Sequence, residues 1–183
     1  MHENPWKILS TKEHYDNPWV NVVEHQVTNP AGNPGIYSVV HFKNLAICVL
    51  PLDEAYNTWV VGQYRFPVEE YSWEIPEGGG PLDTDPLVSA KRELLEECGI
   101  AAQQWMQIAS CHLSNSGTDE KAIIYIAKGL SFQASSPEET EILEVRKIPF
   151  ETLFQMVMNN EVMDAPTIIA VLKTRQLITS GLV

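Results

Sequence analysis

The chain has 183 residues, of which 44% are hydrophobic and 20% charged, and acidic residues outnumber basic ones 24 to 12, for a formal net charge of −12. This length and composition suit one globular domain with a full core, and they argue against disordered and fibrous proteins. The acidic balance also argues against nucleic acid or an anionic membrane as a partner, because both require clustered Lys and Arg.

The start of the chain, Met1–Pro5, lacks a basic region followed by an apolar run, so we expect no signal peptide. No apolar stretch approaches the ~18 residues that a membrane span needs. The cysteines Cys48, Cys98 and Cys111 are scattered without a CxxC pair, which fits a reducing compartment better than a disulfide framework. We therefore expect a cytoplasmic protein.

The first third of the chain predicts β-strands, because it is rich in Val, Ile and aromatic residues between turn signals. The four candidates are Val20–Gln26, Ile36–His41, Ala46–Leu50 and Thr58–Tyr64.

A loop is expected over Glu74–Pro81, because three glycines and two prolines do not suit the middle of a helix. A helix should follow it, with Thr84 or Asp85 as the N-cap, Pro86 at the first helical position and Gly99 as the stop. Apolar residues recur there at helical spacing, namely Leu87, Ala90, Leu94 and Cys98.

Strands are expected to resume after this helix, and two helices to close the chain. The strand candidates are Met106–Leu113, Ala122–Ala127 and Ile142–Ile148, and the helices are Phe150–Asn159 and Ala165–Ile178. Strands, one helix, strands and then helices indicate an α+β fold rather than an alternating parallel one.

The first predicted helix carries three glutamates near its C-terminal end, Glu93, Glu96 and Glu97. Because each helical residue turns by about 100°, Glu96 and Glu97 lie about 60° and about 40° on either side of Glu93, so the three share one face. They repel one another close to the negative end of the helix dipole, and Arg92 relieves only part of this repulsion. Hard divalent cations, which prefer oxygen ligands, would relieve the rest.

A solvated acidic face is the usual meaning of such a charge run, and it would be preferred for this helix taken alone. Its context favours a metal site instead. The Gly/Pro loop directly precedes the helix, and a further acidic pair, Asp119-Glu120, lies in a later polar loop.

The segment around these glutamates resembles the Nudix box, G-x5-E-x7-R-E-U-x-E-E-x-G-U, in which U is aliphatic. Gly78 is followed after thirteen residues by Arg-Glu-Leu-Leu-Glu-Glu-Cys-Gly-Ile at 92–100, which matches eight of the nine defined positions. The exception is Thr84, which stands where the pattern has its first glutamate. The resemblance implies that this glutamate mainly braces the loop and the box arginine, so its replacement weakens the site or frees Arg92 without abolishing metal binding.

Other stretches resemble the ADP-ribose pyrophosphatases of this family. VVGQYR at 60–65 with EIPEG at 74–78 is similar to their QYR…ELPAG, and SNSGTDE at 114–120 is similar to their SPGxSxE loop. The proline that marks ADP-ribose enzymes would fall near Ser116, and its absence bears on substrate identity more than on reaction type.

The likeness covers about residues 5–175, including residues 138–145 as the closing strand. It implies an α+β Nudix fold of mixed β-sheets sandwiched by helices. Residues 1–43 would form an N-terminal antiparallel β extension, and residues 44–183 the Nudix hydrolase domain. In this family the N-terminal region commonly exchanges across a two-fold dimer, so the extension implies a homodimer.

The resemblance also implies the chemistry. Two or three Mg²⁺ or Mn²⁺ ions would bridge the phosphate oxygens, withdraw charge and activate a water molecule. The implied metal ligands are Glu93, Glu97, Glu96 and the backbone carbonyl of Glu77. Glu120 is the candidate general base, which makes the catalytic set Glu120, Glu97 and Glu93. Asp119 is its substitute, and a plain surface turn is the alternative for both.

Three residues are candidate substrate contacts: Arg65, Gly78 and Arg92. The planar guanidinium of Arg65 suits phosphate oxygens, although an ion pair with Glu69, Glu70 or Glu74 is the alternative. Glycines at 78–80 suit a phosphate cradle, although turn formation alone would explain them.

The function that follows is magnesium-dependent hydrolysis of the pyrophosphate bond of a nucleoside diphosphate sugar, with ADP-ribose giving AMP and ribose 5-phosphate. Two alternatives within the Nudix family stay open, and a third lies outside it. One is a Nudix hydrolase for another derivative, such as GDP-mannose or a dinucleoside polyphosphate. The other is a non-catalytic Nudix-like sensor that binds a nucleotide, which Thr84 favours and the retained glutamates disfavour. An unrelated α+β interaction domain is the remaining reading.

Overall fold

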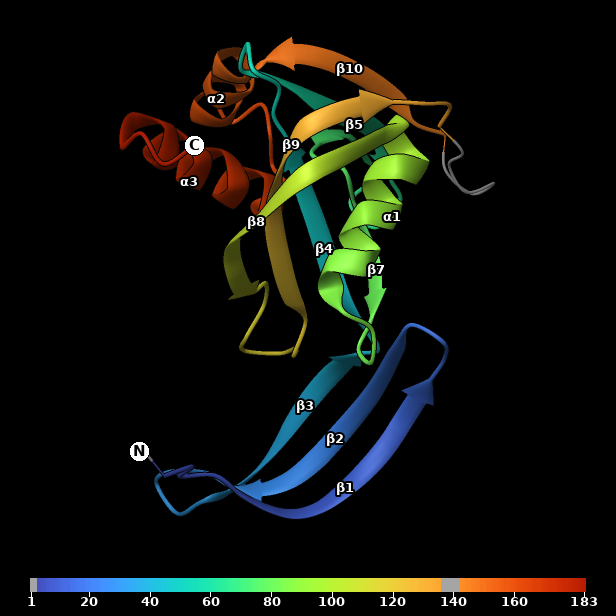
Figure 1. Cartoon of the computed structure of the whole chain (residues 1–183). Coiled ribbons are helices and arrows are strands. Elements are labelled where there is room, and N and C mark those ends of the chain that lie inside the picture. Colours follow the sequence, from blue (N-terminus) through green and yellow to red (C-terminus); the bar gives the residue numbers. More distant parts are fainter. Residues whose placement is uncertain (1–2, 136–141) are drawn as a thin grey trace. The chain divides into compact units, whose positions relative to one another are not determined.

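The computed structural model describes residues 3–135 and 142–183. Within these ranges the chain forms ten strands and three helices (Figure 1). The likeness of residues 138–145 to a closing strand falls partly outside the described residues. The chain divides into two compact units. One comprises the residues up to Asn44 together with His112–Lys121, and the other comprises Leu45–Cys111 and Ala122–Val183.

The first unit is built on an antiparallel sheet of β1 (Lys7–Asp16), β2 (Val20–Thr28) and β3 (Pro34–Phe42), in that order. The predicted strands over β2 and β3 are confirmed. Strand β1 was not predicted, and all ten of its residues are exposed. Because it buries no face, it lacks the apolar alternation by which a strand is recognised in sequence.

The segment His112–Lys121 is tied to β3 within this unit. The Tyr37 hydroxyl donates to the Ser116 carbonyl oxygen at 2.6 Å, and Val40 forms a β-bridge with Thr118. The carboxylate of Asp119 accepts from the Phe42 amide at 2.8 Å and lies 2.6 Å from Nδ1 of His41. These contacts give the polar loop a defined shape.

The second unit contains a four-stranded sheet in the order β7 (Glu77–Pro81), β4 (Asn44–Pro51), β9 (Lys121–Phe132) and β8 (Ile100–His112). Strand β4 runs parallel to β9. Alternate residues of β4 enter different cores. Ile47 and Val49 pack with α1 (Pro86–Cys98). Cys48 and Leu50 pack with the other helices, α2 (Phe150–Met158) and α3 (Ala165–Thr179). Helices therefore cover both faces, which explains the nearly continuous apolar run of this strand (Figure 1).

A second sheet of this unit has the antiparallel order β10-β5-β6. Its strands are β5 (Asn57–Arg65), β6 (Glu70–Glu74) and β10 (Glu144–Pro149). The predicted strand at 58–64 is confirmed within β5. The predicted strand Ile142–Ile148 is confirmed except at its start, where Ile142 and Leu143 precede β10.

The predicted loop over Glu74–Pro81 is wrong in part. Glu74 ends β6, and Glu77–Pro81 forms the strand β7, which lies at one side of the four-stranded sheet. An outer strand tolerates Pro and Gly, and the glycines allow close approach. A Cβ on Gly80 would come within 2.7 Å of the Ile47 side chain.

Strand β8 (Ile100–His112) begins six residues before the predicted start at Met106. Its first half, Ile-Ala-Ala-Gln-Gln-Trp, has no clear alternation, and pairing in the sheet extends it to the end of α1. The α+β class, the mixed sheets and the N-terminal antiparallel strands are confirmed. Among the described residues, no helix is long and apolar enough to cross a membrane.

Candidate active site

The predicted boundaries of helix α1 are confirmed, because the capping residue, the proline and the glycine that marked them all act at its ends. The Asp85 side chain accepts from the Leu87 amide at 3.0 Å, and Pro86 occupies the first turn. Gly99 has φ 64° and ψ 30°, a left-handed cap whose amide donates to the carbonyl oxygens of Leu94 and Leu95. The glutamates of the last turns are thereby held on a rigid element.

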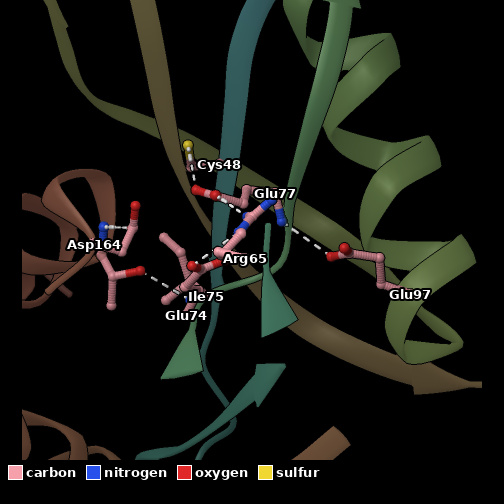
Figure 2. A network of polar contacts seen from close by, with 8 residues as sticks. Cys48, Arg65, Glu74, Ile75, Glu77, Glu97 and Asp164 are labelled. Atoms are coloured by element: carbon pink, nitrogen blue, oxygen red, sulfur yellow. Dashed lines mark hydrogen bonds and ion pairs between the residues drawn. The ribbon is translucent and has the colours of Figure 1, made fainter. Parts of the chain in front are cut away.

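Two of the three glutamates are buried against β7 rather than solvated. Glu93 is 7% exposed and Glu97 only 2%. A Cβ on Gly78 would overlap the carboxylate of Glu93, so only glycine allows this approach. On the next turn, Oε2 of Glu97 accepts from the Glu77 amide at 3.0 Å, as Figure 2 shows. The acidic face of α1 therefore packs on the backbone of residues 77 and 78.

Arg92 connects this helix to the glycine strand. Its guanidinium donates to the Gly79 carbonyl oxygen at 2.8 Å and to the Glu96 carboxylate at 2.7 Å, and it also pairs with Glu93. Burial opposes its charge, but the neighbouring carboxylates outweigh burial and raise the pKa of Arg92. Thr84 does not take part in these contacts. Its hydroxyl lies 3.5 Å from Asp83, and its amide donates to the Pro81 carbonyl oxygen.

Arg65, at the end of β5, lies between two carboxylates. Its Nε is 3.0 Å from both oxygens of Glu74, and its terminal nitrogen pairs with Glu74 and lies 2.6 Å from Oε1 of Glu77 (Figure 2). Burial opposes its charge, but these partners outweigh burial and raise the pKa of Arg65. Of the ion pairs weighed from the sequence, the one with Glu74 is present, whereas the pair with Glu77 was not foreseen.

Glu77 belongs to a partly buried acidic group that the sequence did not reveal. Carboxylate oxygens of Glu74, Glu77 and Asp164 all lie within 4.8 Å of one another. Burial, with Asp164 and Glu74 nearby, raises the pKa of the Glu77 carboxyl well above its usual range, and the Cys48 thiol donates to it at 3.5 Å. Asp164 also accepts from the Thr167 amide at 2.7 Å, as the N-cap of α3. That cap is visible in the sequence, but its place beside Glu77 is not.

Carboxylate oxygens and a nearby backbone carbonyl are the donors that hard divalent cations prefer. Glu93, Glu96 and Glu97 carry such carboxylates on α1, and two of them pack on Glu77 and Gly78 of β7, so the chemistry of these side chains suits a magnesium or manganese ion. The second unit thus brings together the predicted metal ligands with Gly78, Arg92 and Arg65.

The predicted base belongs to the first unit. Asp119 is engaged with His41 and the Phe42 amide, and these contacts outweigh burial and lower the pKa of its carboxyl. Glu120 differs, because burial raises the pKa of its carboxyl. Of the two acids, Glu120 has the pKa direction that suits a group exchanging a proton nearer neutral pH.

Comparison with known proteins adds independent findings. The family model of the Nudix domain matches residues 42–169, and that of the nucleoside diphosphate sugar hydrolase N-terminal domain matches residues 6–40. The chain is 29% identical to the methanol dehydrogenase activator of Bacillus methanolicus and 28% identical to the ADP-ribose pyrophosphatase of Bacillus subtilis strain 168, each over 167 residues that cover 90% of both chains. The crystal structure of an ADP compounds hydrolase superposes with a TM-score of 0.87 over 100% of both chains, at 18% identity, and so matches in fold.

Proposed function

The chain belongs to the Nudix family, and from this premise we propose that it hydrolyses the pyrophosphate bond of a nucleoside diphosphate sugar with the help of magnesium. ADP-ribose is the leading substrate, and AMP and ribose 5-phosphate are its products. The observation that carries the proposal is the burial of Glu93 and Glu97 against Gly78 and Glu77. Two carboxyl side chains with so little exposure, packed on β7 at one helix end, suit a site that receives cations.

The substrate class is supported by two similarities. The N-terminal residues 6–40 match the model of the nucleoside diphosphate sugar hydrolase N-terminal domain, and one relative is named an ADP-ribose pyrophosphatase. A protein of net charge −12 needs a cation to receive a diphosphate, because its own field repels the substrate.

The residues that would hold two or three Mg²⁺ or Mn²⁺ ions are Glu93, Glu96, Glu97 and the backbone carbonyl of Glu77. When bound, these ions supply charge neutralisation of the diphosphate and a more acidic water molecule. Arg92 orients Glu93 and Glu96 through its contacts with both, and it adds positive charge for the phosphate oxygens. The absence of a side chain at Gly78 keeps the Glu93 carboxylate in place.

Glu120 is the proposed general base. Its carboxylate would accept the proton of the water molecule that attacks phosphorus, and the phosphate of the departing AMP or ribose phosphate would leave with the P–O electrons. The carboxylate of Asp119 instead holds the loop in place through its contacts with His41 and the Phe42 amide. For Arg65, the ion pairs with Glu74 and Glu77 favour the structural alternative over phosphate binding.

Product analysis with ADP-ribose and magnesium tests the proposal. We expect release of AMP and ribose 5-phosphate, complete loss of activity after chelation with EDTA, and recovery on adding Mg²⁺. A parallel panel with GDP-mannose and a dinucleoside polyphosphate ranks the substrates. Tight nucleotide binding with no turnover of any compound would instead establish the sensor alternative.

The Glu97→Gln variant tests the site within the same assay. Its amide oxygen can still accept from the Glu77 amide, so the fold should persist, whereas a neutral ligand weakens cation binding. We expect turnover to fall about 10²-fold or more while the melting temperature changes little. Near-normal turnover would refute the metal role of Glu97.

We further propose a cytoplasmic homodimer. The three cysteines are free thiols, which suits a reducing compartment. The first unit exposes several large apolar side chains that dimerisation would cover: Ile8, Leu9, Tyr15, Trp19 and Ile36.

A further inference from the structure

The guanidinium of Arg65 pairs with the residues at both ends of one short corner of the chain, Glu74–Glu77. Glu74 is the last residue of β6 and Glu77 the first of β7, and only Ile75 and Pro76 lie between them. The guanidinium contacts both oxygens of Glu74 and one oxygen of Glu77, so a single planar group spans the corner (Figure 2). Arginine suits this task because its donors form a rigid fork.

The backbone of the same corner is held from three other elements. The Ile75 amide donates to the Thr167 hydroxyl of α3 at 3.0 Å. The Pro76 carbonyl oxygen accepts from the Val49 amide of β4 at 2.8 Å. The Glu77 amide donates to Glu97 of α1 at 3.0 Å. Every residue from 74 to 77 is therefore held by at least one contact, and these contacts fix the chain up to the Glu77 amide, one residue's backbone away from the Glu77 carbonyl.

We propose that Arg65 is a positioning residue, which acts through Glu74 and Glu77 to hold the Glu77 carbonyl beside the glutamates of α1. This inference rests on the proposed function where it takes that carbonyl as a cation ligand. Arg65 does not reach the cation or the substrate phosphates in this role.

The charges around this corner explain why the ion pairs of Arg65 with Glu74 and Glu77 matter. Glu74, Glu77 and Asp164 place carboxylate oxygens within 4.8 Å of one another, and Arg65 is the cation that pairs with two of them. Without its guanidinium, three closely spaced carboxyl groups lose their positively charged partner in a partly buried place. The corner then has to open, and the Glu77 carbonyl moves with it. Replacing one of these carboxyl groups by an amide should close the corner again.

Manganese binding to the full-length protein, measured by electron paramagnetic resonance without substrate, tests this directly. We expect Arg65→Ala to weaken Mn²⁺ binding about tenfold, as loss of an outer-shell partner typically does. Adding Glu77→Gln to Arg65→Ala should restore most of the lost affinity. Arg65→Lys, which keeps the charge but lacks the fork, should lie between the wild type and Arg65→Ala and is the informative variant if Arg65→Ala does not fold.

Steady-state kinetics on ADP-ribose, at Mn²⁺ concentrations that saturate each variant, provide the second readout. A positioning role predicts a lower kcat with KM changed by less than about twofold, whereas loss of a phosphate contact raises KM. The matched control is Arg175→Ala, which removes an exposed 2.7 Å ion pair with Glu151 between α3 and α2 and should change neither quantity.

Three results would overturn the inference. The first is an unchanged Mn²⁺ affinity in Arg65→Ala, and the second is a raised KM in Arg65→Ala that adding Glu77→Gln fails to rescue. The third is tighter Mn²⁺ binding in Arg65→Ala, which would place the ion among Glu74, Glu77 and Asp164. Failure of the proposed function looks different. If the wild type binds Mn²⁺ but hydrolyses no nucleoside diphosphate sugar, the substrate assignment is wrong and the Mn²⁺ series still decides the role of Arg65. If the wild type binds no Mn²⁺, both fail.

Discussion

Gly78 and Glu93 lie in contact across the interface between α1 and β7. The Nudix-box pattern has a glycine at position 78. The structure supplies the reason, since any side chain at this position would overlap the Glu93 carboxylate. The role of this glycine is therefore to leave room for the Glu93 carboxylate rather than to bend the chain.

Gly78→Ala should accordingly impair catalysis more than folding. The added methyl group pushes the Glu93 carboxylate out of place, and we expect kcat/KM to fall roughly 10- to 100-fold, as for a misplaced ligand. Initial rates with ADP-ribose and the melting temperature measure the two effects. Gly35→Ala is the control, because its Cβ would meet only Val27 at 3.9 Å. Equal activity in both variants would contradict this geometry.

The raised pKa of Glu120 predicts the pH dependence of the reaction. A base must be deprotonated to act, so kcat/KM should rise with pH through a pKa that burial raises above the usual value of a glutamate, and this limb should vanish in Glu120→Gln. The same shift opposes folding as pH rises, because burial favours the protonated form. The stability of Glu120→Gln relative to the wild type should therefore increase from acid toward neutral pH.

A pH–rate profile and denaturant titrations at several pH values measure these two effects. Glu120 is still partly exposed, so the stability change should be small. If Glu120→Gln altered only KM and kept the acid limb, another group would be the base.

At the scale of elements, α1 depends on how its C-terminal end meets the chain that follows β9. Gly99 has φ 64°, and a Cβ there would overlap the carbonyl oxygen of Gln133. The Gln133 amide in turn donates to the Gly99 carbonyl oxygen at 2.8 Å. The last turn of the glutamate-bearing helix is therefore anchored to the strand end.

Gly99→Ala should destabilise the protein for two separable reasons, left-handed backbone and overlap. Gly181 has φ 67° with nothing within 4 Å of its would-be Cβ, so Gly181→Ala reports the backbone cost alone. We expect about 1 kcal/mol for Gly181→Ala. Gly99→Ala should cost about 1–3 kcal/mol more, the usual price of overpacking. Urea unfolding measures both free energies, and equal losses would show that the Gln133 contact is unimportant.

At the scale of the whole molecule, the proposed homodimer makes a prediction about mass. A protomer has a mass of 20.6 kDa, and sedimentation at micromolar concentration should give about twice this value. Ile8→Asp places a charge among the exposed apolar residues of the first unit and should shift the protein toward monomer. Ile142→Asp is the control, because Ile142 is 93% exposed in the second unit. A wild-type protein of protomer mass would refute the dimer.

Features that depend on neighbouring residues could be predicted from the sequence. The bounds of α1 follow from Asp85, Pro86 and Gly99, and the shared face of Glu93 and Glu97 follows from helical geometry. The strands over β2, β4, β5 and β9 follow from apolar composition. All of these signals act over a few residues, so they survive without knowledge of the rest of the fold.

Features that depend on distant segments needed the tertiary structure. β1 is a strand because β2 pairs with it, and the glycine-rich β7 is a strand because it lies beside β4. Asp164 approaches Glu77 only because α3 begins next to that corner. Sheet pairing and the meeting of charges are set by where remote parts of the chain pack, and no local pattern encodes that position. The class of reaction could therefore be predicted from the sequence, whereas the contacts of Arg65 with Glu74 and Glu77 were decided by packing.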